Sequence, residues 1–189
     1  TDNILEYAAN QYEDPRFKLG VHEWAALLRL LDKIKPIENV SAHCDIPCKI
    51  YDPITSQLAV LTIIRLVDLI EEIEKKDSLS LADHAQISRL IAQKEEHGHK
   101  VKDEIRIIWG DYIKEPQLEK YPELHNLVHS IMLQSSKVKQ NIDKNAALEL
   151  LEKVNRFAEI FWDSKGIDTF KSKSPYPPEK ELIYPDLKK

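Results

Sequence analysis

Residues 53–76 read PITSQLAVLTIIRLVDLIEEIEKK, and this stretch decides the fold. Its apolar residues recur at helical spacing and cover more than one face of a helix: Leu58, Leu61, Ile64, Leu66, Val67, Ile70 and Ile73. A helix that is apolar on several faces is normally buried among others. Asp52 is a candidate N-cap, and Pro53 suits the first helical turn. We therefore expect a central helix that runs to about Lys76.

Three more helices are predicted on the C-terminal side of this one. They run from Ser80 to about Tyr112, from Pro122 to about Gln140, and from the turn at 141–145 to about Lys165, where Gly166 is a natural C-cap. Ser80 and Asp83 have the spacing of a capping box. The middle of the second helix, Lys94 to Lys102, is polar on all sides and must be solvated or line a site. Four substantial helices joined by short breaks predict a four-helix bundle.

The chain extends beyond these helices on both sides. An amphipathic helix is predicted from Val21 to Ile34, and a proline-rich tail follows Gly166. The fold class is therefore all-α: an up-down four-helix bundle with an N-terminal helical extension and an extended C-terminal arm. The predicted parts are an N-terminal extension or leader (1–42), the bundle with a metal-binding hook at 43–53 (43–165), and the arm (166–189).

Composition excludes several classes of protein. The 189 residues include only 4 Gly, and no dinucleotide-binding or P-loop motif occurs. The net charge of −5 argues against a nucleic-acid partner. The longest apolar run is too short for a transmembrane segment, so we expect a soluble protein. The sequence does not decide between the cytoplasm and a plastid compartment, stroma or lumen.

The string His43-Cys44-Asp45-Ile46-Pro47-Cys48 is the one dense cluster of soft metal ligands in the sequence. Two thiolates and an imidazole suit a thiophilic transition metal, namely Zn, Cu(I) or Ni. A zinc site would need a fourth fixed ligand. Taken alone, the two cysteines are also compatible with a local disulfide or with two unused thiols.

Three separated blocks resemble the nickel superoxide dismutase family. The first is HCDIPCKIYDP (43–53), the second is IIWGDYIKEPQLEKYPELHNLV (107–128), and the third is IFW (160–162). They occur in the family's order and at nearly its spacing. The resemblance implies a four-helix-bundle subunit of a homohexamer, with nickel as the cofactor. The implied reaction is disproportionation of superoxide to dioxygen and hydrogen peroxide.

The resemblance also assigns the metal ligands. Cys44 and Cys48 would supply thiolates, and the backbone amide of Cys44 would supply an anionic nitrogen. The amino group of His43 would be the fourth in-plane donor, and its imidazole an axial ligand. Thiolate and deprotonated amide are strong anionic donors that stabilise Ni(III), and Ni(II) prefers a square-planar set of nitrogen and sulfur donors.

Other residues of the hook region match the family as well. Asp45 and Tyr51 correspond to catalytic residues beside the hook, where Tyr51 would order the approach of small anions and water. Pro47 would fix the turn of the hook. Lys114 matches a family lysine and is a candidate for attracting an anionic substrate, although a solvated loop lysine is the simpler interpretation.

The sequence departs from the family pattern in four places. His43 must be an amino terminus to offer an amine, yet 42 residues precede it, with the small residues Val40-Ser41-Ala42 suited to a cut. Lys49 stands where the family usually has glycine. A Glu–Arg pair that holds the axial imidazole in some members falls at Ala59 and His97. The arm at 166–189 has no counterpart.

Two functions remain open at this point. The first is a nickel superoxide dismutase. The second is a non-catalytic accessory subunit that keeps residues 1–42, lacks the free amine of His43, and docks to a larger assembly, such as one in a plastid or on a thylakoid. The amphipathic segment from Val21 to Ile34 is compatible with both.

Overall fold

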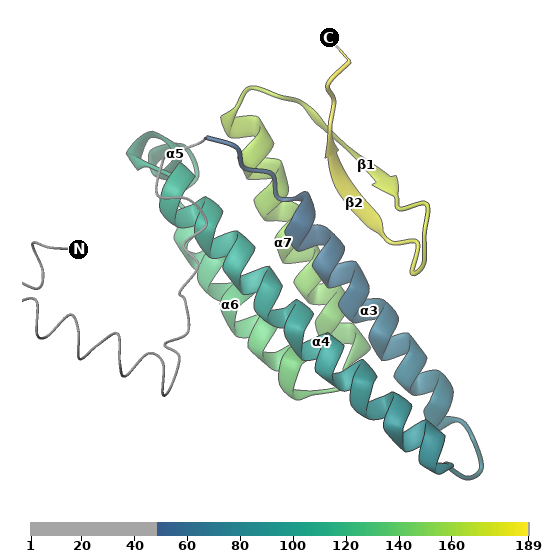
Figure 1. Ribbon diagram of the computed structural model, residues 1–189. Helices are drawn as coiled ribbons and strands as arrows, with labels where there is room; N and C mark the ends of the chain where they lie inside the picture. The colour runs from purple at the N-terminus through teal and green to yellow at the C-terminus, as the bar shows by residue number, and fades with distance from the viewer. Residues whose placement is uncertain (1–48, 189) are drawn as a thin grey trace, which may run out of the picture. The chain divides into compact units, whose positions relative to one another are not determined.

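The computed structural model describes residues 49–188, most of which are helical. The described residues form four long helices and two short helical segments, and the α-helices are labelled in Figure 1. In chain order these are α3 (Ile54–Glu74), α4 (Leu81–Ile107), a π-helical turn (Ile108–Tyr112), α5 (Glu115–Lys120), α6 (Leu124–Gln140) and α7 (Lys144–Ser164). The largely helical fold predicted from the sequence is confirmed. The predicted extension at 1–42 lies outside the described residues.

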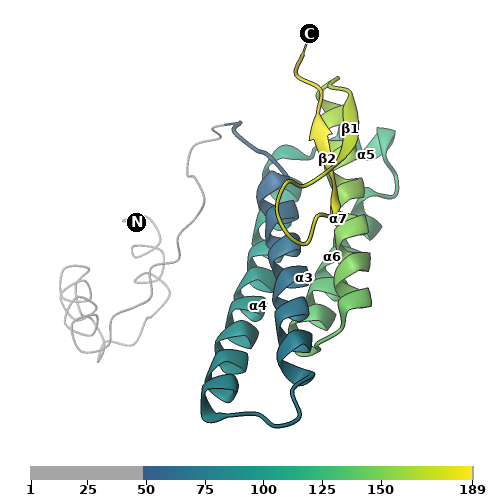
Figure 2. The ribbon, with the colours of Figure 1, turned by 90° about the vertical axis from the view of Figure 1, so that its right-hand side faces the viewer.

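The extensive burial predicted for α3 is confirmed, although each of the four long helices packs against two others. This helix packs against both α4 and α7, and α6 packs against the same two neighbours (Figure 2). Val60, Ile63 and Ile64 are fully buried on α3. Burial of each such side chain stabilises the fold by about 1.5–3 kcal/mol. The apolar surface of α3 thus holds the other helices around one core.

The helix boundaries differ from the predicted ones between α4 and α6. The sequence predicts one helix to about Tyr112 and a break at Lys114-Glu115-Pro116. Instead, the last turn before Ile113 is π-helical, and Glu115 and Pro116 begin the short helix α5. Proline is compatible with the first turn of a helix, because the N–H it lacks has no intrahelical partner there. Pro116 therefore starts a helix rather than ending one.

The capping box predicted at the start of α4 is present. The Asp83 backbone N–H donates to the Ser80 hydroxyl, and the Asp83 carboxylate accepts from the Ser80 backbone N–H. Lys76 also donates to this carboxylate at 2.5 Å. The hydrogen bond from Lys76, followed by those from Ser80, holds the pKa of Asp83 well below its usual range. These hydrogen bonds thus stabilise the turn between α3 and α4.

The polar middle of α4 packs against α6. The Lys94 side chain is only 1% exposed, and its ammonium donates to the carbonyl oxygens of Val138 (2.5 Å), Lys139 (2.7 Å) and Asn141 (3.1 Å). These carbonyls lie at the C-terminal end of α6, where backbone carbonyls have no N–H partner within the helix. One turn along α4, a Cβ on Gly98 would come within 2.4 Å of Lys139 Cγ. This part of α4 is therefore a polar helix–helix contact.

The predicted extended C-terminal arm is wrong. Residues after α7 form an antiparallel hairpin of β1 (Thr169–Lys173) and β2 (Glu181–Pro185), which lies along the helices in Figures 1 and 2. Leu182 and Ile183 are buried, and the Gln57 side-chain amide of α3 donates to the Ile183 carbonyl at 3.1 Å. In β2 the buried residues are adjacent in the sequence, and β1 is mostly exposed and polar. Neither strand therefore shows the alternation of apolar and polar residues from which a strand is predicted.

None of the helices between residues 49 and 188 combines the length and the apolar composition of a membrane-spanning segment.

Replacing Lys94 with methionine should lower the free energy of unfolding by about 1–3 kcal/mol, because three carbonyls at the end of α6 lose a shared donor. Urea denaturation followed by circular dichroism measures this change. Lys100→Met, at an exposed position of the same helix, is the matched control and should shift stability by less than about 0.5 kcal/mol. Equal effects of the two substitutions would show that the Lys94 contacts contribute nothing.

Candidate metal centre

The predicted metal ligands His43, Cys44 and Cys48 lie outside the described residues, as do Asp45 and Pro47. The described chain begins at Lys49, inside the predicted hook segment (43–53) and directly after its last predicted metal ligand, Cys48. From residue 49 to residue 188, no group of three or more His, Cys, Asp or Glu side chains is placed to hold a metal ion. The structure therefore describes what surrounds the C-terminal end of the hook.

Lys49 has a backbone φ of 60°, in the left-handed region that favours glycine. This is the position where the resemblance leads one to expect glycine. The backbone therefore adopts a conformation that suits the family's residue, although lysine occupies the position. A non-glycine residue in this region is disfavoured by about 1–2 kcal/mol.

The chain then enters α3 through a short, hydrogen-bonded turn. The Asp52 carboxylate accepts from the Ile54 backbone N–H at 2.8 Å. The Ser56 hydroxyl donates to the Pro53 carbonyl at 2.7 Å. The N-cap position of α3 is Pro53, which offers no side-chain cap, so the N-cap predicted at Asp52 is wrong and Asp52 instead stabilises the turn before the helix. Because Tyr51 immediately precedes this turn, the turn helps to fix where Tyr51 lies.

Tyr51 begins a row of aromatic rings that leads to α7. Its ring centroid lies 6.1 Å from that of Tyr112, and the Tyr112 centroid lies 5.0 Å from that of Phe161. The Tyr112 hydroxyl is also hydrogen-bonded to the Ser164 hydroxyl at 2.8 Å. The sequence indicates Tyr51 as a residue of the site but gives no sign of Tyr112 or Ser164, because these three residues are distant in the chain.

The π-helical turn determines where Tyr112 lies. The Ile113 backbone N–H donates to the Ile108 carbonyl, five residues back, at 3.2 Å. One extra residue per turn changes the direction of the side chains that follow, and such turns are frequent at functional sites. The sequence pointed to Tyr112 only through the family block that contains it. No local sequence pattern predicts the π-helical turn.

Two lysines lie around this turn. Lys114 is exposed, and its ammonium donates to the Gly110 carbonyl at 3.2 Å. The ammonium of Lys165 lies 4.6 Å from the centroid of the Tyr112 ring and 5.0 Å from that of Phe161. Cations are attracted to the faces of aromatic rings at such distances. Lys165 was not among the residues predicted from the sequence.

The two positions that replace the family's Glu–Arg pair have other roles here. Ala59 is buried in the core on α3. The His97 ring is within hydrogen-bonding distance of the Gln93 carbonyl of its own helix, at 2.8 Å. In the second family block, the His125 ring accepts a hydrogen bond from the indole N–H of Trp109 at 3.1 Å.

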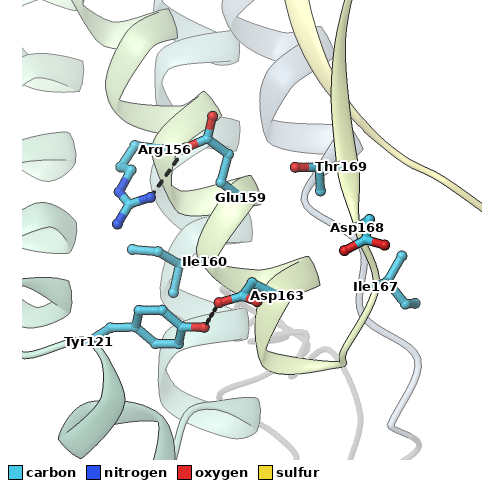
Figure 3. Close-up of a pocket in the computed structure, with 8 residues that line it drawn as sticks. All are labelled: Tyr121, Arg156, Glu159, Ile160, Asp163, Ile167, Asp168 and Thr169. Atoms are coloured by element: carbon cyan, nitrogen blue, oxygen red, sulfur yellow. Dashed lines mark hydrogen bonds and ion pairs between the residues drawn. The ribbon is translucent and has the colours of Figure 1, made fainter.

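A pocket of about 260 Å³ lies on the outer side of α7 (Figure 3). Its charged groups pair with one another or with neighbours: Arg156 with Glu159 at 3.2 Å, and Asp163 with the Tyr121 hydroxyl. Lys120 also donates to Asp163 at 3.0 Å. The hydrogen bonds from Tyr121 and then Lys120 lower the pKa of the Asp163 carboxyl. These contacts hold the C-terminal end of α7, which carries Ser164 and is followed directly by Lys165.

Comparison with known proteins identifies the family to which this chain is similar. The model of the nickel-containing superoxide dismutase family matches residues 38–165. Superoxide dismutase [Ni] of Streptomyces coelicolor and that of Streptomyces seoulensis are each 32% identical over 130 residues, covering 69% of this chain and 93% of theirs. The native structure of a nickel superoxide dismutase matches with a TM-score of 0.57 and 29% identity, covering 65% of this chain and 99% of that one.

Substitutions at Lys49 should separate backbone strain from side-chain charge. Lys49→Gly should bind nickel at least as tightly as the unchanged chain, because glycine adopts a positive φ without strain. Lys49→Val should bind about fivefold more weakly or worse, because a β-branched residue is a severe outlier there. Calorimetric titration with nickel measures both. Weaker binding by the glycine variant would contradict a role for this conformation in the site.

Proposed function

Because this chain belongs to the nickel-containing superoxide dismutase family, we propose that it converts two superoxide anions and two protons into dioxygen and hydrogen peroxide. The observation that carries the proposal is the family match over residues 38–165, which includes the complete hook sequence. The two Streptomyces relatives carry the name of this enzyme, and this chain covers 93% of their length.

The residues of the hook fit the proposed cofactor. His43, Cys44 and Cys48 would hold nickel, since two thiolates and nitrogen donors suit that metal. When bound, nickel supplies the one-electron redox chemistry that superoxide disproportionation requires. A thiolate is the form of cysteine that binds metals, so both cysteines must be deprotonated at the site. The proposal thus requires reduced, unpaired Cys44 and Cys48.

The described residues supply the surroundings of this reaction. Tyr51 follows Cys48 by three residues, and Tyr112 packs beside it at 6.1 Å between centroids. Phenolic hydroxyls both donate and accept hydrogen bonds, so the two tyrosines are suited to ordering water and small anions. Asp45 would contribute the carboxylate beside the hook, and Lys114 a positive charge near the π-helical turn.

A dismutase of this kind requires a free amino group on His43. We therefore assign residues 1–42 to an extension that is removed by a cut after Ala42. A peptide nitrogen at His43 would be a different ligand, because its lone pair is delocalised into the amide. Removal of the extension is thus the event that would complete the donor set.

The family resemblance further suggests an up-down four-helix bundle that assembles into a homohexamer. The ring of contacts α3–α4, α4–α6, α6–α7 and α7–α3 supports the bundle. In this scheme residues 43–165 form the bundle with its hook. Residues 166–189 add the hairpin, which follows the part of the chain that the family model matches.

Intact mass and nickel content of the natively produced protein test this function. The expected result is a chain that begins at His43 and holds about one nickel ion per chain, with superoxide dismutase activity. A natively produced chain that keeps residues 1–42 and contains no nickel would contradict the proposal. That result is the one expected of an accessory subunit.

Removal of either cysteine tests the ligand assignment. Cys44→Ser and Cys48→Ser should each abolish nickel binding and activity, because a serine hydroxyl does not ionise at neutral pH and is a poor ligand for a thiophilic metal. Far-UV circular dichroism should be unchanged, since the helical core lies in residues 54–164. If either variant keeps full activity, the donor set is wrong.

A further inference from the structure

The C-terminal hairpin follows the part of the chain that the family model matches, which ends at residue 165. Hydrogen bonds from two helices hold its second strand. The side-chain amide of Gln57 on α3 donates to the Ile183 carbonyl at 3.1 Å, and that of Asn155 on α7 donates to the Glu181 carbonyl at 2.9 Å. In Figure 1, β2 accordingly lies nearer α3 than β1 does. The helices thus cover one edge of the hairpin, the edge of β2.

The register of the hairpin shows which backbone groups of β1 point away from β2. The Ser174 N–H donates to the Lys180 carbonyl at one end of the hairpin, and the Asp186 N–H donates to the Asp168 carbonyl at the other. Hydrogen-bonded and non-hydrogen-bonded pairs alternate along an antiparallel ladder. In this register, three residues of β1 therefore direct their backbone N–H and carbonyl groups outward: Thr169, Lys171 and Lys173.

These outward groups form an open edge. By the same alternation, the two β2 carbonyls that accept from the helices also point outward, on the opposite side of the hairpin. Within residues 49–188, β1 pairs with no strand other than β2, and its residues from Phe170 to Lys173 are exposed. A row of unpaired backbone donors and acceptors is the feature to which another extended chain adds as a strand.

The side chains along this edge determine which chain would fit. Lys171 and Lys173 lie on one face of the hairpin, because side chains alternate between the faces of a strand. Neither lysine forms an ion pair within residues 49–188. Lys173 has Glu181 opposite it in β2, whereas Lys171 has Ile183 opposite it. The face is therefore positively charged along the open edge, most of all at Lys171.

The other face of the same edge is aromatic. Phe170 is 51% exposed, and its ring stacks on that of Tyr184 with 5.8 Å between the centroids. Residues of an added strand lie directly opposite those of β1 and on the same face, where their side chains interact. A complementary strand thus has acidic residues opposite the two lysines and apolar residues beside Phe170.

A second copy of β1 is a poor occupant of this edge. Antiparallel pairing of two such strands about Lys171 would bring the two Lys171 side chains directly opposite each other. Like charges in that position are destabilising. Lysine on an edge strand deters self-association in this way, and the same charge attracts an acidic chain.

We infer that the outer edge of β1 binds an extended segment of a partner protein in which acidic residues alternate with apolar ones. The segment adds a third strand to the hairpin. Main-chain hydrogen bonds supply affinity in this kind of recognition, and alternate side chains supply specificity. This interaction is independent of the proposed function, because no residue of the hook takes part in it.

Peptide binding to the full chain tests the charge complementarity. The probe is a short fluorescent peptide in which glutamate alternates with valine, and the control peptide has lysine in place of glutamate. Anisotropy at low salt should show at least about tenfold tighter binding of the glutamate peptide. The double variant Lys171→Glu with Lys173→Glu should reverse this preference. Lys100→Glu, at an exposed position of α4, should leave it unchanged.

Two results of this experiment would overturn the inference. The first is equal binding of the two peptides, because the lysines would then select nothing. The second is no binding of either peptide, which would show that the lysines only protect the edge from other strands.

A pair of variants at one position separates strand addition from simple charge attraction. Lys171→Pro and Lys171→Thr both remove the charge, but only proline also removes the outward N–H. Proline is tolerated on an edge strand where its missing N–H would face outward. Lys171→Pro should therefore bind the glutamate peptide about threefold or more weakly than Lys171→Thr does. Equal affinities of the two variants would show that no strand is added.

Hydrogen exchange on the unchanged protein tests the edge without any substitution. The outward amides of Lys171 and Lys173 should exchange rapidly in the free protein and slowly after addition of the glutamate peptide. The amides of Leu182 and Tyr184, which pair with β1, should stay protected throughout. Slow exchange of the outward amides before the peptide is added would mean that the edge is already occupied. That result, or an exchange rate that the bound peptide does not change, would contradict the inference.

Discussion

The burial of α3 is the constraint on which the rest of the structure depends. Because this helix is apolar on more than one face, it is covered by α4 and α7, and α6 then packs against both. Its N-terminal end follows directly from the hook segment and Tyr51. The same burial that holds the helices together therefore also fixes the place where the hook segment joins the folded body.

Polar contacts then set how the outer helices meet. Lys94 satisfies three carbonyls at the end of α6, and Gly98 lets Lys139 come close. A buried ammonium is tolerated only where acceptors surround it, so this contact favours one alignment of α4 against α6. Since α4 leads into the π-helical turn, the alignment also bears on where Tyr112 lies.

The candidate site combines a local motif with distant support. The hook provides its donors within six consecutive residues, and the family match covers them. Its surroundings come from three separate parts of the chain: Tyr51 before α3, Tyr112 in the π-helical turn, and Lys165 after α7. Lys49 has a left-handed backbone conformation. The position therefore keeps a conformation that favours glycine, although lysine has replaced the glycine.

The sequence by itself determined the long helices and the Ser80–Asp83 capping box, because each depends on residues close together in the chain. Only the tertiary structure decided the polar contact of Lys94, the neighbours of Tyr112 and Lys165, and the hairpin that replaces the expected arm. These features join residues 40 or more positions apart, or rest on one-sided burial as in β2. Local periodicity carries no information about such partners, since packing alone brings them together.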